Sequence, residues 1–170
     1  MVQDLISLLQ HGLRVKLSTG EREFHRKVAI ECFNRAWDIL DKKNRSEEDG
    51  FQMLHLAHAS RYHWGLVGTP KNRAVGDWQL SRVYAELGQP RLALEFAESC
   101  LAACRENGLS DIEHTANEAI ARAYAVAKDY DNARRYLTRG RRQLDRLTLS
   151  KGDRAVYLEQ IRDTQALIKE

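Results

Sequence analysis

Three histidines near the middle of the chain are the residues best suited to metal chemistry. His55 and His58 are three positions apart, which places them side by side on a helix, and His63 follows on the same predicted helix. Zinc requires a third protein ligand, and the His-Glu-x-x-His pattern of zinc proteases is absent from the sequence. A metal or small-ligand site around these three histidines is therefore the alternative interpretation. The leading interpretation assigns the protein no metal and no cofactor.

Two of the same histidines fit an aromatic stripe better than a metal site. Phe51, His55, His58 and Tyr62 recur every three or four residues, so they share one face of a helix. The internal repeat described below assigns this face to the outside of the molecule, where an aromatic stripe needs a cover. We therefore interpret the stripe as an interface.

Cysteine and arginine patterns each have a structural explanation that competes with a binding site. Cys100 and Cys104 lie on the apolar side of one predicted helix with no further cysteine nearby, so we interpret them as small buried side chains. An arginine stripe could follow a phosphate backbone, but no aromatic residue that could stack on a base interleaves with it. We interpret it as a solvated outer face and predict no nucleic-acid partner. Its members are Arg135, Arg139, Arg142 and Arg146.

The sequence contains no pattern typical of a catalytic centre. The sequence has no nucleophile and base at the spacing of a catalytic pair, no glycine-rich phosphate loop and no acidic cluster at the spacing of metal ligands. We therefore predict that the protein is not an enzyme and has no catalytic residues.

Composition indicates one globular domain. The chain has 170 residues, of which 43% are apolar and 30% charged, and a formal net charge of +3. No apolar run is long enough to span a membrane, and the N-terminus lacks the basic start and cleavage site of a signal peptide. The odd count of three cysteines does not indicate a disulfide framework, so we expect a reducing, cytoplasmic location.

Helix-capping signals recur along the chain, whereas signals for strands are nearly absent. Ser18, Ser46, Ser110 and Ser150 are each followed three residues later by an acidic residue, which is the capping-box pattern. Thr69 precedes a proline that suits the first position of a helix. These signals predict an all-α protein with a short helix over 2–13 and longer helices over 21–43, 47–67, 70–87, 90–107, 111–128, 130–147 and 151–169.

A shift of 40 residues superposes much of the chain on itself. Under this shift Ser60, Cys100 and Gly140 occupy one position, and all three are small. A small residue permits two helices to cross closely, so we expect each to lie at such a crossing. Repetition with a period of 20–50 residues is typical of stacked helical arrays.

The repeated residues resemble the tetratricopeptide repeat (TPR) family. Tyr84, Gly88, Ala93 and the small Cys100 have the spacing of one repeat, and a second copy follows with Lys128 in place of the glycine. The resemblance implies a right-handed α-solenoid of about three helix pairs. The pairs would cover 21–68, 69–108 and 110–149, with an N-terminal helix or arm over 1–20 and a capping helix over 150–170.

The same resemblance implies a concave groove. It assigns to the groove Trp78, Arg82, Glu86, Glu118 and Arg122. Two arginines beside an indole would suit a partner with an acidic or carboxylate-bearing segment. Local pairing of each arginine with the glutamate four residues away is an equally good interpretation. The predicted function is thus a non-catalytic module that binds a protein or peptide.

Two covers are available for the aromatic stripe. One is the predicted N-terminal helix, which has a leucine stripe of its own. The other is a second copy of the chain, which we favour because a helix stripe can pair with itself across a two-fold axis. The sequence therefore predicts a homodimer.

Overall fold

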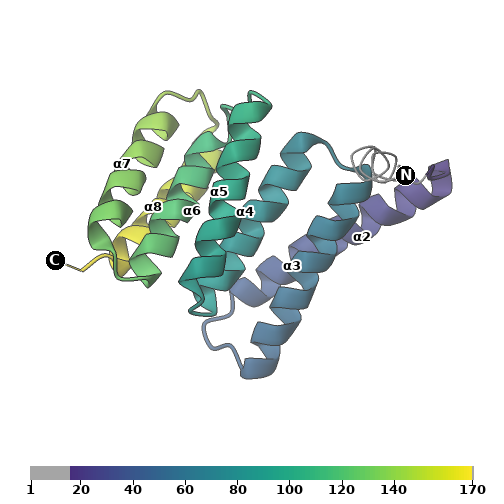
Figure 1. The fold of residues 1–170 in the computed structure, drawn as a ribbon, viewed down its shortest axis with the longest axis horizontal. Helices are drawn as coiled ribbons and strands as arrows, with labels where there is room; N and C mark the ends of the chain where they lie inside the picture. The colour runs from purple at the N-terminus through teal and green to yellow at the C-terminus, as the bar shows by residue number, and fades with distance from the viewer. Residues whose placement is uncertain (1–15, 170) are drawn as a thin grey trace, which may run out of the picture.

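The computed structural model describes residues 16–169, and over this range the protein is all-α with no strand. The predicted all-α class is confirmed, while the predicted helix over 2–13 lies outside the described residues. The helices are α2 (Thr19–Leu40), α3 (Glu47–Val67), α4 (Pro70–Glu86), α5 (Pro90–Glu106), α6 (Glu113–Val126), α7 (Tyr130–Asp145) and α8 (Lys151–Leu167). Figure 1 shows α2 to α7 following one another along the long axis of the molecule, with α8 folded back beside α6 and α7.

Most helices begin at the predicted capping signals. Ser18 and Ser46 each accept a hydrogen bond from the backbone three residues on, and the acidic residue there accepts one from the serine backbone. The prediction that Ser110 caps a helix is wrong. Instead α6 begins at Glu113 with no side-chain cap, because a turn over 110–112 carries Ile112 into the core.

The helices pack as three consecutive pairs, α2 with α3, α4 with α5 and α6 with α7, followed by α8. The even-numbered helices also contact one another in order, α2 with α4, α4 with α6 and α6 with α8. Among the described residues, the backbones of α3, α5 and α7 do not approach one another in this way, although His58 of α3 packs edge-on against Phe96 of α5 with ring centroids 5.9 Å apart. The backbones of the even-numbered helices therefore form the more closely packed row.

The structure repeats with the period found in the sequence. Tyr84 stacks on Phe96 with ring centroids 5.4 Å apart, and 40 residues later Tyr124 stacks on Tyr136 at 5.7 Å. The helix ends also correspond, because Gly88 and Lys128 both adopt left-handed backbone with φ of 67° and 65°. Lys128 thus takes the conformation that the repeat requires, although glycine adopts it more readily.

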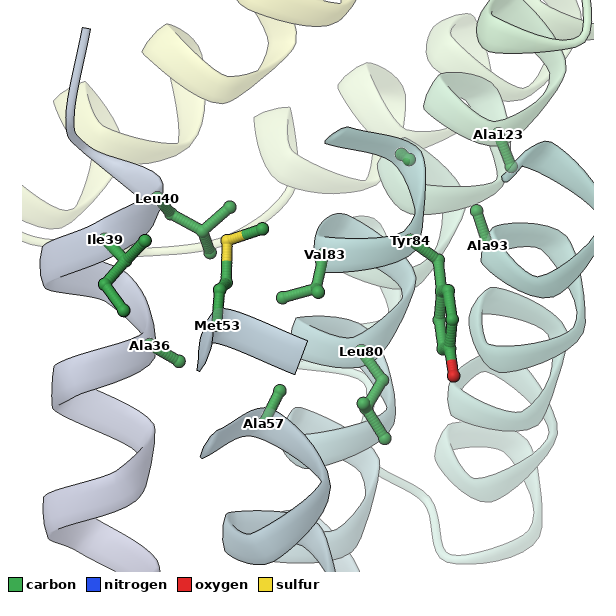
Figure 2. Packing of buried hydrophobic residues seen from close by; sticks show 11 residues of the cluster. Ala36, Ile39, Leu40, Met53, Ala57, Leu80, Val83, Tyr84, Ala93 and Ala123 are labelled. Carbon is green, nitrogen blue, oxygen red and sulfur yellow. The ribbon is translucent and has the colours of Figure 1, made fainter. Parts of the chain in front are cut away.

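The core runs through successive helix pairs. Figure 2 shows one buried cluster in which Ile39 of α2, Met53 of α3 and Leu80 of α4 are neighbours, with Tyr84 and Ala93 beyond them. Met53, Leu80 and Ala93 are fully buried. This cluster therefore joins α2, α3, α4 and α5 through their apolar faces.

A buried ion pair joins three helices. Asp77 of α4 is buried, and Nε of Arg61 from α3 lies 2.5 Å from its Oδ1. The hydroxyl of Ser99 from α5 donates to the other oxygen of Asp77 at 3.0 Å. Gly76 makes room for this link, because a Cβ there would lie 2.7 Å from Cδ of Arg61.

The small residues of the repeat lie at close helix crossings. The hydroxyl of Ser60 donates to the carbonyl of Ala29 in the neighbouring helix at 2.8 Å. Cys100 is buried in the cluster that contains Ala74 of α4. A Cβ on Gly140 would lie 3.0 Å from the carbonyl oxygen of His114 in α6.

We expect Gly140→Ala to lower the free energy of unfolding by about 1–3 kcal/mol. The added Cβ would meet the carbonyl oxygen of His114 and the backbone nitrogen of Glu118, at 3.0 and 3.4 Å, and backbone atoms yield less readily than side chains. This cost outweighs the helix propensity of about 1 kcal/mol that alanine gains over glycine.

Urea denaturation of this variant and of Gly20→Ala provides the measurement. Gly20 lies in the first turn of α2, and a Cβ added there would have nothing within 4 Å, so Gly20→Ala should be at least as stable as the parent. Equal stabilisation by both substitutions would show that α6 and α7 do not cross closely at Gly140.

Candidate ligand-binding cavity

A cavity of about 680 Å³ lies along the row of even-numbered helices. Its walls come from α2, α4, the start of α6, and α8, and Cys100 of α5 also lines it. About half of the side chains around it are aromatic or aliphatic, and most of the others are polar or charged. The aromatic and aliphatic members are Phe33, Trp37, Val75, Trp78, Ile112, Val156 and Tyr157.

A pair of tryptophans forms the aromatic centre of this wall. The rings of Trp37 and Trp78 have centroids 5.2 Å apart with planes inclined by 38°, and Phe33 packs edge-on against Trp37 at 6.3 Å. All three side chains are only partly buried. The cavity therefore offers a continuous aromatic surface to a ligand.

Of the five residues predicted to line the groove, Trp78 and Arg82 line this cavity. Nε of Arg82 lies 3.3 Å from Oε1 of Glu86, and its Nη2 lies 3.8 Å from Oδ2 of Asp163 on α8. Burial and the charge of Arg122 lower the pKa of Arg82, while the surrounding carboxylates oppose this change. Glu86 belongs to the same charge network but lines a separate hollow near Arg45.

Glu118 and Arg122 do not line the cavity, because α8 covers them. Nε of Arg122 lies 3.2 Å from Oε1 of Glu118, and its Nη2 donates to the carbonyl of Gln160 on α8. The hydroxyl of Thr164, also on α8, donates to Glu118. Both predicted local pairs, Arg82 with Glu86 and Arg122 with Glu118, are thus present. The structure does not place two unpaired guanidinium groups in one groove.

The charged residues that line the cavity are mostly acidic. Asp41 at the end of α2, and Asp153, Glu159 and Asp163 of α8 face a single basic residue, Arg82. Asp163 is the partner of Arg82, while the other three have no ion pair among residues 16–169. The cavity wall therefore carries excess negative charge.

The aromatic stripe lies on α3, away from the cavity. Phe51 and Tyr62 are 56% and 65% exposed, and His55 is exposed as well. Nε2 of His58 lies 2.8 Å from the hydroxyl of Tyr84, and burial, with His55 nearby, lowers the pKa of His58. The stripe is open enough for an interface, so the homodimer stays a prediction.

The three histidines of the alternative metal site diverge in the structure. His58 faces Tyr84, whereas Nδ1 of His63 lies 2.7 Å from Nδ1 of His25 on α2. Burial and the charge of His25 lower the pKa of His63. Across residues 16–169, no group of three or more histidine, cysteine or carboxylate side chains is arranged to hold a metal ion.

The remaining patterns are also placed by the structure. The arginine stripe is exposed along α7, and Cys100 and Cys104 are buried with free thiols. In the part of the chain that the structure describes, no helix combines the length and apolarity needed to cross a membrane.

Sequence reasoning missed Phe33, Trp37 and the residues of α8. The family resemblance is poorest in the first helix, so no groove position was assigned there. Trp37 precedes Trp78 by 41 residues, one more than the repeat period, and this near-match is the sequence feature that could have indicated Trp37 as a cavity residue. The contribution of α8 depends on how the chain folds back on itself, which no local pattern encodes.

Comparisons with family models, with curated proteins and with solved structures found no match. The resemblance to tetratricopeptide repeats therefore depends on the repeated residues themselves.

Proposed function

We propose that the chain is a non-catalytic helical-repeat module that binds a segment of another protein in the cavity. The proposed architecture is a TPR-like right-handed solenoid of three helix pairs, with α8 as the capping helix. The recurring aromatic pairs, the matching helix ends at Gly88 and Lys128, and the ordered contacts of the even-numbered helices support it.

The observation that carries the proposal is the partly exposed aromatic wall of Phe33, Trp37, Trp78 and Tyr157. Ligand pockets usually enclose about 300–1,000 Å³ and are lined by apolar and aromatic side chains with a few polar groups. Large aromatic side chains are also the commonest anchors of protein interfaces. A cavity of about 680 Å³ with this lining is therefore suited to receive side chains of a bound peptide.

The free thiols of the buried cysteines accord with a reducing cytoplasm, which we propose as the compartment.

Selection from a displayed random peptide library against the full-length protein tests the proposed function. The decisive variant is Val156→Trp, because Val156 is 54% exposed and lines the cavity, so a larger side chain there would fill the binding space. We expect it to weaken the selected peptides by at least about tenfold while leaving the melting temperature unchanged.

Leu167→Trp is the matched control, since Leu167 is exposed on the same helix and does not line the cavity. It should bind the selected peptides like the parent. Failure to select any peptide, or equal binding of every selected peptide to the Val156→Trp variant, would contradict the proposal.

A further inference from the structure

We propose that the cavity selects a cationic side chain, the lysine or arginine of a partner segment, in place of the acidic group that the two arginines suggested from sequence. This inference rests on the proposed function and specifies the chemistry of its ligand. It follows from three features: arginines near the cavity that already lie beside carboxylates, acidic side chains of the cavity wall that have no ion pair within residues 16–169, and aromatic rings that line the same cavity.

The arginines near the cavity do not supply free positive charge. Arg45, Arg82 and Arg122 pair with Glu86, Glu118 and Asp163, so three basic groups meet three carboxylates. The distances from these arginines to their carboxylate partners lie between 2.6 and 3.8 Å. Arg82 is the only member of the basic set that lines the cavity. Its Nε has no hydrogen-bond partner among the described residues, but Glu86 and Asp163 lie 3.3 and 3.8 Å from the guanidinium group, so a carboxylate ligand would compete with two carboxylates for one arginine.

The acidic side chains that line the cavity, by contrast, can attract a cation. Asp41, Asp153 and Glu159 line the cavity and have no ion pair within the described part of the chain, and Asp153 accepts one hydrogen bond, from the hydroxyl of Ser150. Asp41 caps the C-terminal end of α2, where the helix dipole also attracts positive charge. The neighbouring Lys42 does not neutralise this wall, because its Nζ lies 2.6 Å from Oδ1 of Asp49.

The aromatic residues complete the fit to a basic side chain. Trp37, Trp78 and Tyr157 line the same cavity, and the face of an indole or phenol ring attracts a cation. Lysine and arginine also have long aliphatic stems, which can cover apolar surface while the charged end stays near carboxylates. Val75, Ile112 and Val156 provide that apolar surface. A glutamate or aspartate in the same place would face like charges.

The test uses the peptides selected against the full-length protein and keeps those whose binding is lost in the Val156→Trp variant. We expect these cavity-dependent peptides to be enriched in lysine and arginine. Replacing the critical basic residue of a peptide by alanine should weaken binding by about tenfold or more. Binding should also weaken as salt is added, because the carboxylates are exposed.

Charge-reversing substitutions in the protein provide a second test of the cationic ligand. Asp41→Lys and Glu159→Lys should each weaken the basic peptides by about tenfold. Asp38→Lys makes the same charge change on the same helix as Asp41→Lys, but Asp38 does not line the cavity, so its effect should stay below about twofold. Equal melting temperatures of the variants and the parent would show that the fold is intact.

Each contrary outcome has a distinct meaning. Cavity-dependent peptides enriched in aspartate or glutamate, or unaffected by Asp41→Lys and Glu159→Lys, would overturn the cationic ligand and leave the proposed function standing. The absence of any cavity-dependent peptide would overturn both. Self-association that Val156→Trp abolishes would identify a second copy of the chain as the occupant, which also contradicts the proposal.

Discussion

Replacing Arg122 by alanine is expected to lower the free energy of unfolding by about 3–5 kcal/mol. The side chain of Arg122 is only 4% exposed, and it pairs with the equally buried Glu118 while donating to the carbonyl of Gln160. Its removal would leave the Glu118 carboxylate buried with the hydroxyl of Thr164 as its remaining close partner. Urea denaturation at neutral pH measures the loss.

The matched control is Arg141→Ala, which removes an arginine from an exposed pair with Asp145 at the same four-residue spacing. Exposed pairs contribute about 0–1 kcal/mol, so this variant should differ little from the parent. The double variant Arg122→Ala with Glu118→Ala should lose less than the two single losses combined, because the stranded carboxylate is gone. Equal, small losses for Arg122→Ala and Arg141→Ala would contradict the burial of this pair beneath α8.

Acidification from pH 7 to pH 5 is expected to destabilise the protein by about 2 kcal/mol through His114 alone. His114 is 2% exposed, and burial lowers its pKa from 6.5 to about 4, against a smaller opposing effect of Asp111. The unfolded chain therefore binds a proton near pH 6.5 while the folded protein resists it. The contribution of neutral His114 to the free energy of unfolding is therefore complete above pH 6.5, and it is lost as the pH falls toward 4.

His114→Phe removes this titration and keeps an aromatic ring against Tyr157, whose centroid lies 4.5 Å from that of His114. The variant should lose about 2 kcal/mol less than the parent between pH 7 and pH 5, as measured by urea denaturation at each pH. The lowered pKa values of His58 and His63 act in the same direction in both proteins and cancel in the difference. An NMR titration of the parent that gives His114 a pKa near 6.5 would contradict the prediction directly.

The helical elements were largely predictable because their signals are local. The reciprocal hydrogen bonds at Ser18 and Ser46 involve residues three apart, so the sequence shows both partners at once. Ser110 has the same pattern, yet the burial of Ile112 moves the start of α6 beyond it. Burial depends on distant residues, and here it outweighs the local signal.

The binding surface was less predictable for the same reason. The repeat assigned Trp78 and Arg82 to a groove, and both line the cavity. It also assigned Arg122 there, but α8 packs across α6, covers Arg122, and supplies Tyr157 and three of the four acidic residues that line the cavity. Residue spacing predicts which side chains share a face of one helix. The contact of α8 with α6 determines which of those side chains stay exposed to a ligand.

The link between Arg61, Asp77 and Ser99 has a consequence for cooperativity. In a linear array each helix pair could in principle open by itself, since it contacts only its neighbours. Here α3 cannot separate from α4 without leaving the buried carboxylate of Asp77 without its counterion. The first pair and the second are therefore expected to open as one unit, so amide hydrogens on both sides of this boundary exchange with solvent through the same event.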